Sequence, residues 1–124
     1  MIIGIGTDIV EVERIKNSIE KYGKRFLDRI YTETEQKYSE SFNDNKYVHY
    51  AARFAAKESF SKAIGTGLTR GFKFREVGIV NEKSGNPQMI LDGGMKEKWG
   101  DTSIHVSLSH TDNNAIAYVI MERE

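Results

Sequence analysis

The chain has 124 residues, a length that suits one compact domain, and its 18 basic and 18 acidic residues give a formal net charge of zero. A neutral chain has no overall attraction to nucleic acid or to a membrane surface, so any charged docking surface must be local. The absence of cysteine excludes disulfides, thiolate nucleophiles and cysteine metal sites. No segment approaches the roughly 20 apolar residues that span a bilayer. We expect a single domain over residues 1–124, soluble and cytoplasmic, with neither nucleic acid nor membrane as its partner.

The first segment, "MIIGIGTDIV", predicts a short strand whose glycines allow a neighbouring element to approach closely. A helix is expected to begin at about Asp8 or Ile9, because Asp8 and Glu11 have the spacing of a capping box. Apolar residues then recur as one helical stripe, at Ile15, Ile19, Tyr22 and Phe26. Gly23 falls within this stripe, where glycine breaks or bends a helix.

Thr32 and Glu35 predict the capping box of another short helix. The stretch "ARFAAKESFSKAIGTG" indicates a long helix from about Lys46 to Ile64, closed by Gly65. Two strand–turn–strand patterns follow. In the first, "GFKFREVGIV" and "PQMIL" flank the turn "NEKSGN", and in the second, "SIHVSLSH" and "AIAYVIM" flank the turn "TDNN". The segment "GGMKEKWGDT", between the two patterns, fits one helical turn or a loop. We expect an α+β fold, with the helices of the N-terminal half packed on a small antiparallel sheet.

The long helix carries its charges on one half of its circumference. At about 100° per residue, this half contains Arg53, Phe54, Lys57, Glu58, Ser61 and Lys62. It is expected to face solvent, a partner or a cleft, whereas the small residues of the other half can pack closely. Glu58 and Lys62 lie one turn apart, and an exposed pair of this kind contributes only about 0.2–0.5 kcal/mol. Considered alone, the helix favours such a surface pair.

Two other segments carry polar residues that also have an ordinary structural explanation. Asp8 lies at the expected end of a strand, where on its own it is better explained as a helix cap. In "IHVSLSHT", apolar residues occupy one face of a strand and polar residues the other, the latter being His105, Ser107 and Ser109. A histidine on the polar face of a strand is usually just solvated, so His105 alone indicates little.

Taken together, "GIGTDIV", "RFAAKESFSKAIGTG" and "HVSLSHT" have the order and spacing found in the bacterial holo-(acyl-carrier-protein) synthases. The chain resembles this family of small 4'-phosphopantetheinyl transferases from end to end, and Lys57-Glu58 with Lys62 is the most specific element. The resemblance implies transfer of phosphopantetheine from coenzyme A to a serine of apo acyl carrier protein in fatty acid biosynthesis. Adenosine 3',5'-bisphosphate would be released.

The resemblance also implies roles for individual residues. Asp8 and Glu58 would hold Mg²⁺, which is often bound by one or two carboxylates together with substrate phosphates and water. Lys62 would add a positive charge at the same phosphates, as the third catalytic residue. The residues expected to bind the coenzyme, besides Lys62, are Arg53, Phe54, Ser61, Gly65, Thr66 and His105. The proton of the attacking serine could pass to Glu58 directly or through a water, an alternative that the sequence leaves open.

Acyl carrier proteins are acidic, so a neutral enzyme needs a local basic surface to bind one. The resemblance implies that the first helix engages the carrier, and its candidate residues are Arg14, Lys21, Lys24 and Arg25. A solvated helix face is the simpler structural explanation for them. Family members are homotrimers with each coenzyme site shared between two chains, and we expect the same here.

Two other functions fit the same residues. One is another Mg²⁺-dependent phosphotransferase or nucleotide hydrolase that uses Asp8 and Glu58; preference for coenzyme A over ATP would exclude it. The other is a non-catalytic oligomeric binding module, in which Asp8 caps a helix and Glu58 and Lys62 form a surface pair. A Rossmann domain is disfavoured because "GIG" lacks the third glycine and the βαβ sequel, and the segment 65–67 lacks the full P-loop pattern.

Overall fold

In a computed structural model of the protein, residues 1–65, 67 and 72–124 are described. The strands are β1 (Ile2–Glu11), β2 (Val77–Asn81), β3 (Pro87–Leu91), β4 (Ser103–His110) and β5 (Asn114–Glu122). The α-helices are α1 (Val12–Tyr22), α2 (Lys24–Ile30), α3 (Glu33–Glu40), α4 (Lys46–Ala63) and α5 (Gly93–Trp99), and short 3₁₀ turns cover Asn43–Asn45 and Phe74–Glu76. The predicted α+β class is therefore confirmed, as are both hairpins of the second half. The strand predicted in "GFKFREVGIV" begins only at Val77, because Phe74–Glu76 form a 3₁₀ turn.

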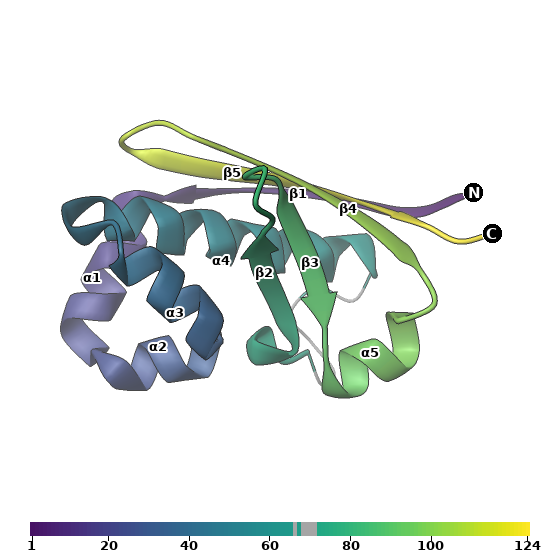
Figure 1. The fold of residues 1–124 in the computed structure, drawn as a ribbon, viewed down its shortest axis with the longest axis horizontal. Coiled ribbons are helices and arrows are strands. Elements are labelled where there is room, and N and C mark those ends of the chain that lie inside the picture. Colours follow the sequence, from purple (N-terminus) through teal and green to yellow (C-terminus); the bar gives the residue numbers. More distant parts are fainter. Residues whose placement is uncertain (66, 68–71) are drawn as a thin grey trace.

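The strands form two antiparallel sheets, a three-stranded one in the order β1-β5-β4 and the β2–β3 hairpin. Helix α4 runs along the three-stranded sheet, with α1, α2 and α3 gathered at one end and the hairpin and α5 toward the other (Figure 1). The two termini lie together because Met1 and Arg123 exchange two main-chain hydrogen bonds of 2.9 Å. Among the described residues, no helix is both long enough and apolar enough to cross a membrane.

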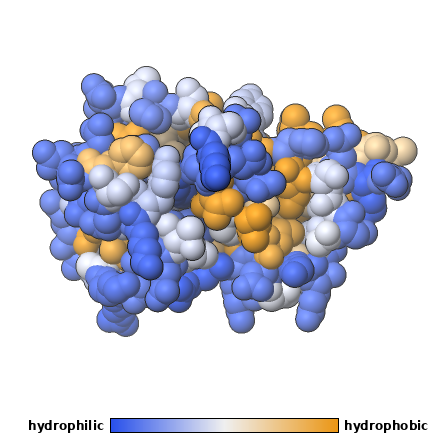
Figure 2. Space-filling view, viewed as in Figure 1, coloured by the Kyte–Doolittle hydropathy of each residue, from blue (hydrophilic) through white to orange (hydrophobic). Residues whose placement is uncertain are grey.

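The surface alternates between polar and apolar regions. In the space-filling view, apolar side chains gather over β3 (Figure 2). Ile90 of this strand is exposed, and a hollow beside it lies between β3, α5 and the start of β4. The surface over α1, α2 and α3 is mainly hydrophilic in the same view.

β1 lies directly against the backbone of α4, as the glycine-rich start of the chain predicted. A Cβ atom at Gly4 would clash with the carbonyl oxygen of Ala63, and one at Gly6 would clash with that of Ser59. Only glycine permits this approach, because any larger residue would push the strand away from the helix. Five alanines of α4 are buried and complete the close packing, at positions 51, 52, 55, 56 and 63.

The predicted first helix begins later than expected. Residues 8 and 9 belong to β1, which pairs with β5 as far as Glu11, and Asp8 lies opposite Ala117 in this ladder. The helix begins at Val12, and the Glu11 side chain makes no capping hydrogen bond. The predictions of a helix from Asp8 and of a capping box from Asp8 to Glu11 were therefore wrong. Pairing with β5 supplies hydrogen-bond partners for the backbone groups of residues 8 and 9, so no side-chain cap is needed at that position.

Gly23 separates α1 from α2, in agreement with the predicted break, and its φ of 60° lies in the region that favours glycine. Ile15 and Ile19 are buried as the helical stripe predicted. Tyr22 is exposed, because the chain changes direction at the glycine that follows it, so the stripe was wrong at that position.

The other predicted helix boundaries agree with the structure. Thr32 and Glu35 form the expected capping box, with hydrogen bonds of 3.2 Å from the Glu35 amide and 2.9 Å to its Oε1. Helix α4 ends at Ala63, and Gly65 follows with a φ of 84°. The segment that fitted a helical turn or a loop forms α5.

The charged half of α4 is not all accessible, which corrects the prediction that it faces solvent, a partner or a cleft. Lys57 is fully buried, and its Nζ donates to Glu35 Oε1 at 2.7 Å and to the carbonyl oxygens of Phe74 and Val77 at 2.9 and 2.8 Å. Glu35 Oε2 accepts a hydrogen bond from the Ile79 amide. Burial lowers the pKa of Lys57, and the Glu35 carboxylate opposes that shift. The pair joins α3, α4 and the start of β2.

Candidate active site

Asp8, Glu58 and Lys62 meet where β1 crosses the last turns of α4. Asp8 shares the helix-facing side of β1 with Gly4 and Gly6, because side chains alternate along a strand. Its Oδ1 accepts a hydrogen bond of 3.0 Å from Lys62 Nζ, which also donates to the carbonyl oxygen of Thr7 at 3.0 Å. One chain thus brings together the three residues predicted to be catalytic. Lys62 pairs with Asp8, not with Glu58 as the surface-pair interpretation of the helix would have it.

The two carboxyl groups lie within hydrogen-bonding reach of each other. The pKa of Glu58 is raised to about 7, first by burial and then by the neighbouring Asp8 carboxyl group, while Lys62 and Arg14 oppose the shift. Asp8 Oδ2 is buried and has no hydrogen-bond partner. Two crowded carboxyl groups and an unpaired buried oxygen are a poor arrangement on their own, and a cation between them would relieve it.

These oxygen donors fit a hard divalent cation such as Mg²⁺, which prefers carboxylates and retains several waters. In the part of the chain that the structure describes, no group of three or more histidine, cysteine, aspartate or glutamate side chains could hold a metal ion. Asp8 and Glu58 would therefore supply two ligands of an open site. The remaining positions would be left for water or for a substrate.

A hollow of about 200 Å³ opens beside the carboxyl groups, between β1, α1, α2 and α4. Its walls are mixed: apolar side chains such as Val10, Ile15, Phe26 and Phe54 lie beside the polar groups of Arg14 and Ser18. Phe54, which was expected in the coenzyme pocket, thus lies next to Glu58. Such a cavity can hold an apolar or amphipathic chain with its reactive end at the carboxyl groups.

Other residues expected at the coenzyme pocket lie near the end of α4. Ser61 is buried, and its hydroxyl donates to the carbonyl oxygen of Glu58 at 2.6 Å, so it serves the helix itself. Gly65 follows that helix directly. Thr66 lies outside the described residues.

Arg53 is not with the carboxyl groups in a single chain. It precedes Glu58 by five positions, which turns it about 140° away around the helix. The guanidinium is buried, stacks over the ring of Tyr38 at 4.3 Å, and donates to Asn81 and to the His49 carbonyl oxygen. Its Nε has no partner, and burial lowers its pKa.

His105 lies on the other side of the three-stranded sheet. It is opposite Ile120, which is opposite Ile5 in turn, and these residues point away from α4. Its Nε2 contacts Glu122 Oε1 at 2.6 Å. The face predicted to be polar is therefore exposed as expected, but one chain does not bring His105 to Asp8 and Glu58.

The basic residues predicted to bind a partner lie on α1 and α2. Arg14 borders the hollow beside Asp8, Lys24 pairs with Asp28 at 2.6 Å, and Arg25 lines a second hollow of about 410 Å³. That hollow is completed by Tyr22, Phe26 and Arg29. The sequence did not predict that Arg29 lies beside Arg25. The break at Gly23 could have indicated that α2 places the two residues side by side.

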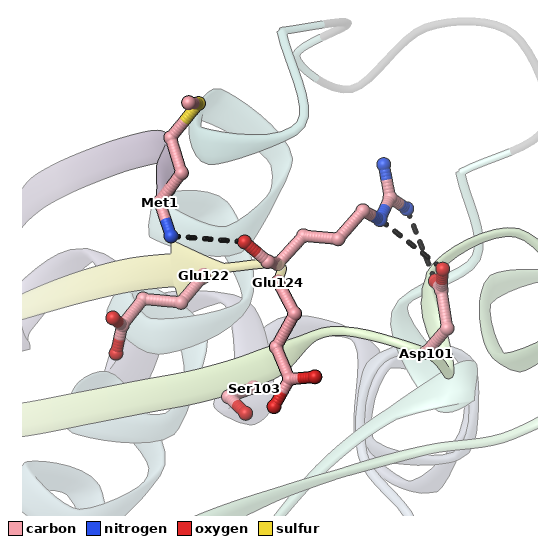
Figure 3. Close-up of a pocket in the computed structure, with 6 residues that line it drawn as sticks. Met1, Asp101, Ser103, Glu122 and Glu124 are labelled. Atoms are coloured by element: carbon pink, nitrogen blue, oxygen red, sulfur yellow. Dashed lines mark hydrogen bonds and ion pairs between the residues drawn. The ribbon is translucent and has the colours of Figure 1, made fainter.

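A hollow of about 520 Å³, larger than either of these, lies elsewhere, at the ends of β1, β4 and β5 (Figure 3). Most of its charged groups already have partners: Arg123 binds Asp101 at 3.0 and 3.1 Å, the Met1 amine donates to the Arg123 carbonyl oxygen, and Glu122 contacts His105. Neither Asp8 nor Glu58 borders it. Size alone therefore does not identify the site, and the buried unpaired oxygen of Asp8 lies in the smaller hollow.

The chain is similar to known proteins over nearly its whole length. Residues 4–119 match the family model of the 4'-phosphopantetheinyl transferase superfamily. A holo-[acyl-carrier-protein] synthase of Clostridium tetani is 48% identical over 100% of this chain and 98% of its own length, and one of Mesorhizobium japonicum is 44% identical over 98% and 93%.

Solved structures are similar over the whole chain as well. A holo-(acyl-carrier-protein) synthase from Bacillus anthracis in complex with CoA (3',5'-ADP) has a TM-score of 0.85 and 34% identity, covering 100% of this chain and 99% of its own. A holo-[acyl-carrier-protein] synthase from Neisseria meningitidis has a TM-score of 0.88 and 35% identity, covering 99% and 100%.

Proposed function

The chain belongs to the 4'-phosphopantetheinyl transferase superfamily, and we propose that Asp8 and Glu58 form the metal site at which its reaction takes place. It transfers the 4'-phosphopantetheine moiety from coenzyme A to a serine of apo acyl carrier protein and releases adenosine 3',5'-bisphosphate. The product would serve fatty acid biosynthesis. The observation that carries the proposed site is the contact of the two carboxyl groups, with Asp8 Oδ2 buried and unpaired.

Asp8 and Glu58 hold Mg²⁺ in this proposal, and Lys62 binds oxygens of the coenzyme diphosphate. When bound, the ion supplies positive charge that stabilises the negative charge developing on the diphosphate during transfer. The serine oxygen forms a bond to the phosphorus that carries the pantetheine arm, while the bond from that phosphorus to the nucleotide breaks. The serine proton passes to Glu58 directly or through a water.

Mass spectrometry of apo acyl carrier protein incubated with this protein, coenzyme A and Mg²⁺ tests the proposal. We expect a gain of one phosphopantetheine mass, and a loss of rate of about 100-fold or more in Asp8→Asn and in Glu58→Ala. Glu97→Ala, at an exposed acid of α5, is the matched control. Near-normal transfer by folded Glu58→Ala would remove that residue from the mechanism, and ATP hydrolysis without transfer would favour the alternative phosphotransferase.

The carrier docks, in this proposal, on the basic residues of α1 and α2, namely Arg14, Lys21, Lys24 and Arg25. Arg14 supports this location because it borders the hollow that contains Asp8 and Glu58. Charge reversal at Arg14 and Lys21 should raise the KM for the carrier severalfold, and more so at low salt, because screening weakens such contacts. Lys98→Glu is the control, and an unchanged KM in the double reversal would exclude this surface.

We also propose a homotrimer, in which the uncovered face of the three-stranded sheet packs against a second chain. This face carries four large exposed apolar side chains, those of Ile3, Ile5, Ile9 and Tyr118. His105 lies on the same face, so a second chain packed there would place His105 at a subunit boundary. The contact that His105 is proposed to make with a coenzyme phosphate would then lie between two chains. Light scattering should give three times the chain mass, with dissociation in Ile5→Lys; a monomeric wild-type protein would contradict the trimer.

A further inference from the structure

Lys62 is bonded to the carboxylate that is expected to bind the metal. Its Nζ lies 3.0 Å from Asp8 Oδ1 and 3.0 Å from the Thr7 carbonyl oxygen. The side chain of Asp8 is 12% exposed and that of Lys62 is 54% exposed. The lysine thus reaches from solvent to a largely buried carboxylate and, among the described residues, is the only cation within ion-pair distance of it.

The ammonium and a divalent cation cannot both remain bound to Asp8 without cost. The ammonium is bound to Oδ1 and an ion would be drawn to the unpaired Oδ2 of the same carboxylate, and like charges at such a short separation repel strongly where water is partly excluded. Lysine carries its charge on a flexible four-carbon chain, so this exposed side chain can move away without disturbing α4. Once released, the ammonium has three donors and no acceptor, which suits phosphate oxygens.

We propose that Lys62 exchanges partners during the binding of substrates: it neutralises Asp8 when the site holds no cation, and it is released to the coenzyme diphosphate when a divalent ion takes its place. This inference rests on the proposed metal site of Asp8 and Glu58. With both carboxylates ionised, the three side chains carry a net charge of −1, and a divalent ion changes it to +1. An anionic diphosphate is then attracted to a group of residues that repelled it before.

The exchange has two consequences for the free protein. The ion must displace an ammonium, so the affinity of the protein for the metal alone is lower than two carboxylates would otherwise give. The released ammonium adds to the attraction for the coenzyme, so metal and coenzyme each favour the binding of the other. The lysine that later binds the phosphates is therefore also the group that neutralises Asp8 in the empty site.

Binding of Mn²⁺ in the absence of coenzyme tests the exchange, with free Mn²⁺ measured by its electron paramagnetic resonance signal. We expect Lys62→Gln to bind Mn²⁺ roughly fivefold more tightly than the wild type, since the competing ion pair is worth up to about 1 kcal/mol. Lys62→Arg, which keeps the charge, should bind no more tightly than the wild type. Lys98→Gln, which removes an exposed lysine of α5, should not differ from it.

The outcomes separate this inference from the proposed function. Wild-type Mn²⁺ binding by Asp8→Asn would overturn the metal site itself. Loss of binding in Asp8→Asn together with wild-type affinity in Lys62→Gln would overturn only the exchange.

A second measurement uses chemical acetylation of the wild-type protein, followed by mass spectrometry of its peptides. Mn²⁺ alone should speed acetylation of Lys62 relative to Lys98, because the ammonium is released from Asp8. A rate that is unchanged or slower at Lys62 would contradict the exchange.

Discussion

Two lysines of α4, five residues apart, pair with carboxylates in opposite ways. Lys57 and Glu35 are both 0% exposed, and all three donors of the ammonium have partners. The Lys62–Asp8 pair is partly exposed, and one oxygen of Asp8 is buried without a partner. The chemistry of the pairs is the same, so completeness of hydrogen bonding is what differs. A complete buried network fixes the fold, whereas an incomplete one is available to a ligand.

The largest expected effect is on the complete pair. Lys57→Met leaves the Glu35 carboxylate buried without a counter-ion and two carbonyl oxygens without a donor, so the free energy of unfolding should fall by about 3–5 kcal/mol. Urea denaturation measures this. The double variant Glu35→Leu, Lys57→Met should regain part of the loss, because no buried charge remains. A loss below about 1 kcal/mol in the single variant would mean that the two pairs do not differ in kind.

The incomplete site should reduce the stability of the metal-free protein. Glu58 has a pKa of about 7 in the fold and an ordinary value of 4.5. The unfolded chain therefore releases this proton first as the pH rises, and folding stability is lost between about pH 4.5 and 7. Glu58→Gln should raise the free energy of unfolding at pH 8 by about 1 kcal/mol, a figure reduced because the side chain is only half-buried.

The measurement is urea denaturation in the presence of a chelator. At pH 4.5, Glu58→Gln should leave the free energy of unfolding almost unchanged. Mg²⁺ should stabilise the wild-type protein at pH 8 more than Glu58→Gln, because it binds the folded state preferentially. The control is Glu97→Gln. Equal destabilisation of Glu58→Gln at both pH values would mean that Glu58 is a structural residue, like Glu35.

The smallest expected effect is the loss of Lys62 itself. Lys62→Gln should change the free energy of unfolding by less than about 0.5 kcal/mol, because a partly exposed ion pair is weak and is screened by salt. Thermal denaturation of Lys62→Gln and of Lys57→Met under the same conditions compares the contributions of the two lysines to stability. A loss comparable to that of Lys57→Met would show that the second pair holds the fold as well.

Local sequence rules predicted the elements that depend on neighbouring residues. The capping box of Thr32 and Glu35, the break at Gly23 and both hairpins agree with the structure. The prediction that Asp8 caps a helix was wrong because β5, more than 100 residues away in the sequence, determines the environment of Asp8. Pairing with β5 extends β1 past the position at which capping rules would start a helix. Such a pairing leaves no local pattern.

The buried pair shows a second limit. Glu35 Oε1 accepts hydrogen bonds from both the Thr32 amide and Lys57 Nζ. The first bond follows from spacing along the chain, but the second requires α3 to pack against α4, which spacing does not show. Family resemblance, in turn, indicated Asp8, Glu58 and Lys62, which one chain brings together. It also indicated Arg53 and His105, which one chain leaves apart and whose roles stay predictions.

Gly4 and Gly6 set how far Asp8 lies from Glu58. At these two glycines β1 lies directly on the main chain of α4, so the separation depends on a contact between backbones there. A single methyl group at position 6 would lift the strand and carry the Asp8 carboxyl away from the helix. Residue 6 is thus a place where the spacing of the two carboxylates can be tuned while both remain in the sequence.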